Sequence, residues 1–186
     1  MIVFTYYDTS IPKPEPQGEL LTFWSSSWRK AGWSPRILLP GHTVKHPQYE
    51  ALKQHSPGWR KWLALALQGG GWMSEYDVIN YGFTSQDRRR MDGVILVDVD
   101  HVPCVVRATM TGSDKIISAA IAEGGSARSY FQKRQFGKNT PKDCVEFGNP
   151  GWQEAPLVHF SQRSCAAAGF ASKREAMLHC GRPAPC

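Results

Sequence analysis

Apolar residues along the chain recur at two spacings, which predict alternating strands and helices. The run from Ile2 to Tyr6 is β-branched and aromatic, as in a buried strand. Further strands are predicted over residues 36–39, 93–99, 102–106 and 157–160. A helix is predicted over residues 19–31, because its apolar residues follow helical spacing: Leu20, Leu21, Trp24 and Trp28. This alternation favours an α/β sandwich as the fold class.

The helix between Pro57 and Gly69 has the clearest predicted boundaries. Ser56 can cap it, Pro57 suits its first position, and Gly69 can take the left-handed conformation at its end. Its apolar residues cover more than half of its circumference, so we expect it to be deeply buried. Two capping boxes predict later helices: Thr111 with Asp114, for a helix ending near Gly124, and Ser172 with Glu175, for a short terminal helix.

Length and composition indicate one ordinary globular domain. The chain has 186 residues, of which 41% are hydrophobic and 20% charged. We expect a domain over residues 1–165 and a C-terminal tail over 166–186, because the tail has few large aliphatic side chains. No apolar run approaches the roughly 20 residues of a membrane span, and no signal-like segment opens the chain. A cytoplasmic location is therefore expected.

Net charge indicates the class of partner, and the cysteines indicate whether a zinc site is present. The formal charge of +6 favours anionic partners such as nucleotides or an acidic membrane surface. Two basic clusters, Arg88-Arg89-Arg90 and Lys133-Arg134, lie near aromatic residues, but no nucleic-acid-binding signature accompanies them, so nucleic acid is not expected as a partner. The five cysteines include no C-x-x-C pair, which indicates free thiols rather than a zinc site.

Two acid-x-acid triplets are the main candidates for chemistry: Glu75-Tyr76-Asp77 and Asp98-Val99-Asp100. Two carboxylates spaced i, i+2 on an extended segment point the same way and can share a divalent cation that bridges a diphosphate. The alternative is a solvated turn with two surface acids. Only the first triplet follows a helix and three glycines, Gly69 to Gly71, which allow close approach of backbone to a ligand.

The segment from Arg60 to Val78, which reads RKWLALALQGGGWMSEYDV, resembles the sugar-binding segment of GT-A glycosyltransferases. The similarity is greatest to relatives of the yeast initiating mannosyltransferase and of the sugar-transferring clostridial toxins. It implies a Rossmann-like nucleotide-sugar-binding fold, Mn²⁺ (or Mg²⁺) as cofactor, and a nucleotide-sugar donor. Glu75 replaces the usual aspartate. The second triplet, Asp98 and Asp100 after an apolar strand, also resembles a metal site of this family and stays the alternative.

The resemblance also assigns roles to individual residues. Glu75 and Asp77 would hold the metal and the donor diphosphate, with His159 as a third metal ligand. The remaining candidates would contact the donor: Thr5 and Tyr7 at the nucleotide base, Arg60 near the diphosphate, and Gly70, Gly71 and Trp72 along its wall. Because a strand alternates, one of Tyr6 and Tyr7 must face the core.

The expected function is therefore metal-dependent transfer of a hexose from a UDP- or GDP-sugar. The acceptor is an unidentified glycan, lipid or protein, and the resemblance implies retention of anomeric configuration. The main alternative is a non-catalytic carbohydrate- or nucleotide-binding or scaffold protein on the same fold. Peripheral contact with an acidic membrane fits the basic charge.

Overall fold

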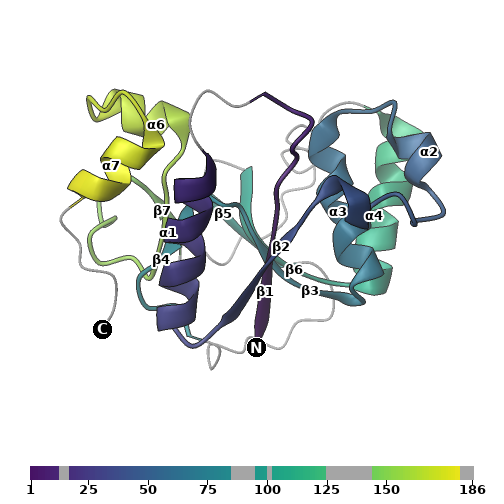
Figure 1. The fold of residues 1–186 in the computed structure, drawn as a ribbon, viewed down its shortest axis with the longest axis horizontal. Coiled ribbons are helices and arrows are strands. Elements are labelled where there is room, and N and C mark those ends of the chain that lie inside the picture. The colour runs from purple at the N-terminus through teal and green to yellow at the C-terminus, as the bar shows by residue number, and fades with distance from the viewer. Residues whose placement is uncertain (13–16, 85–94, 100–101, 125–143, 181–186) are drawn as a thin grey trace.

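A five-stranded mixed sheet lies at the centre of the molecule (Figure 1). The computed structural model describes residues 1–12, 17–84, 95–99, 102–124 and 144–180. The strand order is β2-β1-β3-β6-β5, in which β1 is parallel to β2 and β3, and β6 is antiparallel to β3 and β5. The strands are β1 (Ile2–Tyr6), β2 (Ser34–Leu38), β3 (Gly70–Ser74), β5 (Ile95–Val99) and β6 (Val102–Thr109).

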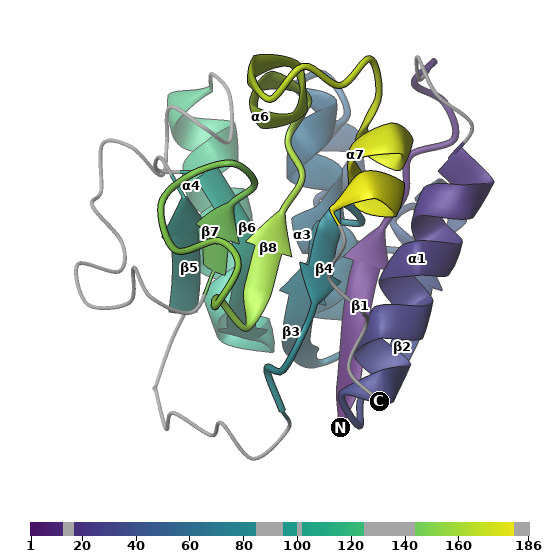
Figure 2. The same cartoon turned by 90° about the vertical axis from the view of Figure 1, so that its left-hand side faces the viewer.

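A smaller sheet and the helices complete three layers. The small sheet has the order β4-β8-β7, built from β4 (Val78–Asn80), β7 (Cys144–Glu146) and β8 (Leu157–His159). It lies on the same side of the main sheet as helices α1 (Gln17–Lys30), α6 (Gln162–Ala167) and α7 (Lys173–His179) (Figure 2). The other side carries the short turns η1 (Pro40–His42) and η2 (Pro57–Trp59) and helices α2 (Tyr49–Leu52), α3 (Arg60–Leu67) and α4 (Met110–Glu123).

Strand alternation in the main sheet points its apolar side chains into two cores, one on each face. Phe4, Met73 and Val106 point toward α2, α3 and α4, where they join the fully buried Trp59 and Trp62. Val3, Trp72 and Val105 point to the opposite face and pack with Trp24 and Trp28 of α1. These four tryptophans are 0% exposed, which confirms their predicted core positions.

A third core explains why the C-terminal part belongs to the same unit. Leu20 of α1, Phe160 after β8 and Ala176 of α7 are 0% exposed and pack in one cluster. Aromatic side chains that follow β7 and β8, among them Phe147, belong to the same cluster, and Met177 of α7 completes it. Helix α7 thus packs against the rest of the described chain, although its sequence reads as a tail.

Most predicted elements are present, and two of the predicted caps differ. Strand β1 has the predicted bounds, and the mixed α/β class is confirmed. Thr109, not Thr111, caps α4, because its side chain accepts a hydrogen bond from the N–H of Gly112. Ser56 makes no side-chain cap, since the chain enters α3 through the turn η2. Ser172 caps α7 as predicted, accepting from the N–H of Glu175 at 3.1 Å.

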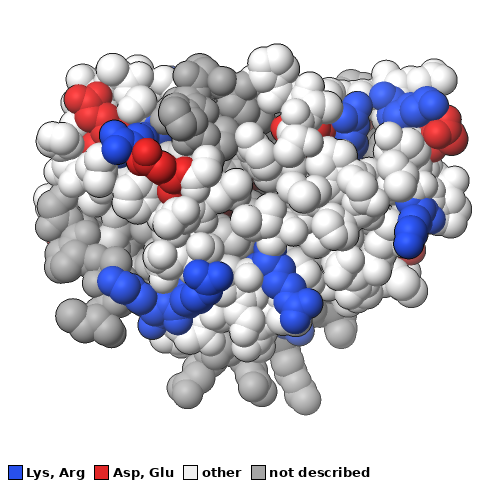
Figure 3. Space-filling model, viewed as in Figure 1, with Lys and Arg blue, Asp and Glu red and all other residues white. Residues whose placement is uncertain are grey.

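Charged side chains are grouped on the surface. Figure 3 shows separate groups of basic side chains on one face, and among the described residues no acidic side chain is seen beside the groups on its lower part. Helix α1 ends with the exposed Arg29 and Lys30, where cations interact favourably with the helix dipole. No helix in the described ranges has both the length and the apolar character needed to cross a membrane.

Candidate functional site

The carboxyl ends of β1 and β3 bring the predicted acids next to the residues that follow the first strand. The two strands are parallel, with Val3 paired to Trp72 and Phe4 to Met73. Tyr7 and Asp8 therefore leave the sheet at the same edge as Glu75. In open α/β sheets this carboxyl edge is where ligands bind.

Glu75, Tyr76 and Asp77 form a turn between the two sheets, here called the acid turn. The N–H of Glu75 still donates to Cys104 of β6 at 2.8 Å, and its carbonyl accepts from the N–H of Val78 at 3.2 Å. The chain thereby leaves β3 and enters β4. The sequence suggested that the two acids lie on an extended segment, but in the structure they lie in a turn. Their side chains consequently point toward different elements.

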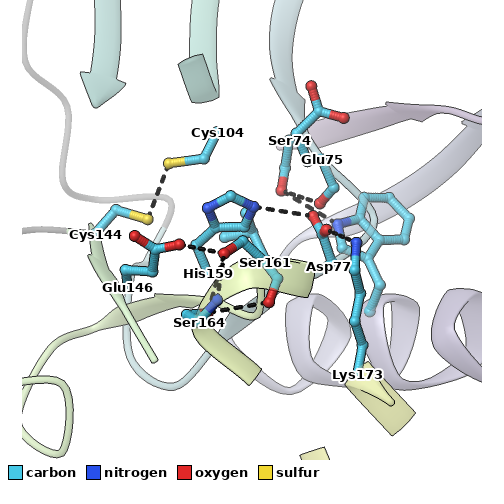
Figure 4. A network of polar contacts seen from close by, with 12 residues as sticks. Ser74, Glu75, Asp77, Cys104, Cys144, Glu146, His159, Ser161, Ser164 and Lys173 are labelled. Atoms are coloured by element: carbon cyan, nitrogen blue, oxygen red, sulfur yellow. Dashed lines mark hydrogen bonds and ion pairs between the residues drawn. The ribbon is translucent and has the colours of Figure 1, made fainter. Parts of the chain in front are cut away.

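Asp77 is a buried carboxylate held by two cationic groups (Figure 4). It is 6% exposed. Its Oδ2 accepts from Nζ of Lys173 on α7 at 2.5 Å, and its Oδ1 lies 3.4 Å from Nε2 of His159 at the end of β8. Burial alone would raise the pKa of Asp77, but His159 and Lys173 outweigh it and hold that pKa well below its ordinary value.

The contact between Asp77 and His159 shifts the pKa of His159 in the opposite direction, upward. Its burial disfavours the imidazolium form, but the Asp77 carboxylate outweighs burial and raises the pKa of His159 to about 9. The structure thus places Asp77 and His159, two of the predicted metal ligands, next to each other. The imidazole is held as a cation at neutral pH, and a protonated imidazole does not coordinate a metal.

Glu75 and Tyr76 contact other elements of the same edge. Glu75 forms an ion pair with Lys61 of α3, and its side chain is 30% exposed. The Tyr76 ring packs edge-on against Tyr7 at 6.1 Å between ring centroids, and Nζ of Lys173 lies 5.6 Å from its centroid. Burial is the main cause that raises the pKa of Tyr76 to about 12, so its hydroxyl stays protonated.

Asp8 makes a third ion pair beside the acid turn. Nη1 of Arg60 donates to Asp8 Oδ2 at 3.0 Å and to the Ser10 hydroxyl at 3.2 Å. Ser10 donates from its N–H and its hydroxyl to Asp8 Oδ1. Although burial acts against it, these contacts lower the pKa of Asp8. We call these side chains together the ion-pair cluster: Asp8, Arg60, Lys61, Glu75, Asp77, His159 and Lys173.

Of the predicted donor-wall residues, Gly70 and Gly71 lie at the other end of β3 and Trp72 lies in its middle. Gly70 and Gly71 open the strand, four or five residues before the acid turn, and a side chain on Gly70 would meet the backbone of β6 at 2.4 Å. Trp72 is 6% exposed and packs against Trp33 and Phe83. The close approach that these glycines allow is therefore between strands, and the structure does not bring Trp72 to the acid turn.

The base-contact candidates divide as strand alternation requires. Tyr6 packs against the first core, whereas Tyr7 lies beyond the strand end, half-buried beside Tyr76. Thr5 is 0% exposed, and its hydroxyl has no hydrogen-bond partner among the described residues. Of the two predicted base-contact residues, Thr5 and Tyr7, only Tyr7 lies beside the ion-pair cluster.

A divalent cation shared by Glu75 and Asp77 does not fit this arrangement. Glu75 pairs with Lys61, and Asp77 pairs with Lys173 and His159, so both carboxylates of the predicted metal pair are already balanced by side-chain cations. Within the described ranges, no three side chains of His, Cys, Asp or Glu are grouped to hold a metal ion. A metal here would have to displace two ammonium groups.

Strand β5, which contains the alternative acid Asp98, ends at the same edge. Strand β5 runs antiparallel to β6 and therefore in the direction of β3, and Val97 pairs with Val105, which in turn pairs with Ser74. Asp98 thus lies two strands away from the acid turn in the sheet. Asp100, the side chain of Asp98 and both basic clusters, Arg88–Arg90 and Lys133-Arg134, lie outside what the structure describes.

Sequence reasoning missed three members of the ion-pair cluster: Asp8, Lys61 and Lys173. A signal existed for Asp8, which follows the first strand directly, and for Lys61, which is next to Arg60. Nothing in the sequence distinguishes Lys173 from an ordinary surface lysine of a helix start. Its role depends on how α7 packs.

Comparison with known proteins adds no relative: no protein-family model and no curated protein sequence matches the chain.

Proposed function

We propose that the chain is a glycosyltransferase with a GT-A-like fold that uses a nucleotide-diphosphate sugar, and that its donor binds at the carboxyl edge of β1 and β3. The resemblance of residues 60–78 suggests this activity. The arrangement of the acid turn supports the location. A UDP- or GDP-sugar is the donor class, and a glycan, lipid or protein is the acceptor.

The observation that carries the proposal is the convergence of charged side chains on the acid turn. Residues from β1's end, α3, β8 and α7 meet there, although they are up to 165 positions apart in the chain, from Asp8 to Lys173. Ion pairs that are this buried rarely add net stability over apolar packing. Buried charges with displaced pKa values at a ligand-binding edge are typical of functional sites.

Tyr7 and Tyr76 give the cluster a surface suited to a nucleotide. The two rings are half-buried and meet edge to face. An aromatic ring at the end of the first strand can stack on uracil or guanine. The cations around it can balance the charge that develops on a leaving nucleoside diphosphate, which is the main electrostatic task of such a transfer.

Donor turnover tests the proposal. Purified protein is incubated with a panel of UDP- and GDP-sugars, with Mn²⁺ and separately with EDTA, and released nucleotide is measured by chromatography. We expect release from at least one donor, and loss of release in Asp77→Asn. Asp114→Asn is the matched control, because Asp114 also lies 3.3 Å from a histidine, His46, but on helix α4.

Two outcomes would contradict the proposal. One is the absence of both binding and release for every nucleotide sugar. The other is release that is equal in Asp77→Asn and wild type. If Asp77→Asn fails to fold, Tyr76→Leu replaces it, since Tyr76 supplies one of the two rings proposed to face the nucleotide.

A non-catalytic nucleotide-binding protein is the second candidate. One observation favours it: every carboxylate of the ion-pair cluster is paired with a cation. Such paired charges suit a site that binds a ligand without reacting with it. Calorimetric binding of UDP or GDP without release from any donor, over a broad acceptor panel, would identify this candidate.

A further inference from the structure

We propose that Arg60, Lys61 and Lys173, rather than a divalent cation, neutralise the diphosphate of the bound nucleotide. This inference rests on the proposed function and specifies how its site recognises the donor. It departs from the metal dependence that the sequence resemblance implies.

The charge balance of the cluster carries the first step. Three carboxylates, on Asp8, Glu75 and Asp77, face three permanent cations, on Arg60, Lys61 and Lys173. A Ca²⁺-, Mg²⁺- or Mn²⁺-binding site needs carboxylate oxygens whose charge is not already balanced. Here a divalent cation would lie beside two ammonium groups that repel it. An incoming diphosphate would instead meet cations already gathered at one edge.

The positions of the cations carry the second step. The side chains of Arg60, Lys61 and Lys173 are 20%, 14% and 15% exposed, so each is largely buried and held in place by its carboxylate partner. Lys173 of α7 lies 5.6 Å from the centroid of the Tyr76 ring. Arg60 and Lys61 of α3, on the other side of the sheet, pair with Asp8 and Glu75, which directly follow Tyr7 and precede Tyr76 in the chain. Phosphate oxygens are strong acceptors for such groups, and a pre-positioned cation loses little conformational entropy on binding.

Arg60 provides an independent sign of unused donor capacity. Its Nη1 binds Asp8 and Ser10, but its Nε is buried and has no hydrogen-bond partner among the described residues. A buried donor without a partner is destabilising and calls for an acceptor. A guanidinium that shifts from Asp8 toward a phosphate would satisfy Nε and Nη together, in the bidentate geometry that arginine favours.

Calorimetry of UDP and GDP in EDTA and in Mn²⁺ tests the inference. We expect wild-type protein to bind at least one of the two nucleotides in EDTA, with an affinity that Mn²⁺ changes little. Lys61→Met should weaken this metal-free binding about tenfold, which corresponds to one charge-assisted contact. Its partner Glu75 is 30% exposed and can be hydrated, so this variant should keep its fold.

Matched controls separate the site from general charge. Lys53→Met removes a lysine that pairs with Glu50 of α2 on the surface. Arg174→Met removes an arginine that is next to Lys173 in the chain and pairs with Glu19. Both should bind nucleotide like wild type. Lys173→Met should weaken binding as Lys61→Met does, while Lys61→Arg should restore most of it.

The possible failures are distinguishable. Binding that requires Mn²⁺ and vanishes in EDTA would overturn the inference and leave the proposed function intact. Equal affinities of Lys61→Met and Lys53→Met would also overturn it. If neither nucleotide binds under either condition, the proposed function itself fails.

Discussion

A carboxylate that is 6% exposed stays ionised only if cations lie against it, and Asp77 has two, Lys173 and His159. The consequence for His159 is that its imidazole keeps its proton to a higher pH than an ordinary histidine does. Glu75 and Cys104 also lie near enough to favour its charged form. The residue is therefore a sensitive reporter of the ion-pair cluster.

We expect the stability of the protein to fall as pH rises from 6.5 to about 9, in part because His159 loses its proton. A group whose pKa is raised on folding stabilises the fold fully below its unfolded pKa, and this stabilisation is lost as pH passes the folded pKa. Urea unfolding across this range measures the effect. NMR titration should place the His159 imidazole near the upper limit, and titration near pH 6.5 would contradict the expectation.

Asp77→Asn should reduce the free energy of unfolding by about 3–5 kcal/mol, because it removes the charge of a buried pair and leaves Lys173 and His159 without it. It should also remove the pH dependence described above. The same change at Asp114, whose side chain is 44% exposed, should cost less than about 1 kcal/mol. Thermal or urea denaturation of the two variants makes the comparison.

The sequence predicts some of these residues and not others for a physical reason. Glu75 and Asp77 follow an apolar segment, so their place at a strand end can be inferred from the pattern. His159 lies at the end of a predicted late strand and can be placed in the same way. Their ion pairs cannot be inferred, because Lys61 and Lys173 reach the site through the packing of α3 and α7 against the sheet, which no local pattern specifies.

At the scale of elements, the junction between α3 and β3 depends on consecutive glycines. Gly69, Gly70 and Gly71 have φ values of 81°, 88° and 133°, a region that glycine enters without steric cost. Gly69 ends the helix, as predicted. Gly70 adds a second requirement, because a Cβ there would lie 2.4 Å from the carbonyl oxygen of Ala108.

Gly70→Ala should therefore destabilise the protein by about 2–5 kcal/mol, the sum of a left-handed backbone and an overpacked contact. Gly69→Ala, which has the same backbone conformation but open space around it, should cost only about 1–2 kcal/mol. Equal losses in the two variants would show that contact with β6 does not matter. Denaturant unfolding decides between them.

The main sheet and the small sheet also meet through two cysteines. Sγ of Cys104 on β6 lies 3.0 Å from Sγ of Cys144 on β7, and both residues are 1% exposed. Figure 4 shows this pair beside His159. The sequence indicated free thiols and gave no reason to pair these two, since 40 positions separate them.

We expect oxidised glutathione to link Cys104 to Cys144 in a disulfide, with two glutathione thiols as the other product. Geometry favours this pair over Cys165 or Cys180, and the link should stabilise the fold by about 2–4 kcal/mol. Peptide mapping without reduction identifies the pair. Cys104→Ser should remove both the linked peptide and the gain in melting temperature, and linkage to another cysteine would contradict the prediction.

The elements that sequence reasoning missed are the short ones. Strands β4 and β7 have three residues each, and Val78–Asn80 follows the acid turn without a break in pattern. Their strand character comes from pairing with β8, not from local periodicity. Longer elements, such as β1 and α4, carry enough alternation or helical spacing to be predicted within a few residues.

At the scale of the whole molecule, the main sheet contributes to cores on both of its faces. We therefore expect the described part of the chain to unfold in one step. Leu63→Ala, at a 0% exposed position of α3, should cost about 2–5 kcal/mol and lower the stability of both faces together. Leu178→Ala, at a 50% exposed position of α7, should change stability by less than about 0.5 kcal/mol.

Tryptophan fluorescence and far-ultraviolet circular dichroism follow this transition with different probes. Trp59 and Trp62 report on one face of the main sheet, whereas Trp24 and Trp28 report on the other. Coincident unfolding curves in Leu63→Ala would support one cooperative unit. Two separate transitions would show that the layers unfold independently.

The pairing of Asp77 with Lys173 also sets a time scale for biosynthesis. The two residues are 96 positions apart. A ribosome that adds about 5–20 residues per second needs on the order of 5–20 s to make the chain between them. For most of that interval, until β8 and its His159 have been made, Asp77 has neither of its cations and β4 has no strand to pair with. In the nascent chain the acid turn therefore stays hydrated, and the apolar side chains of α1 that pack against the C-terminal part stay exposed. This is the stage at which a chaperone would protect the nascent chain.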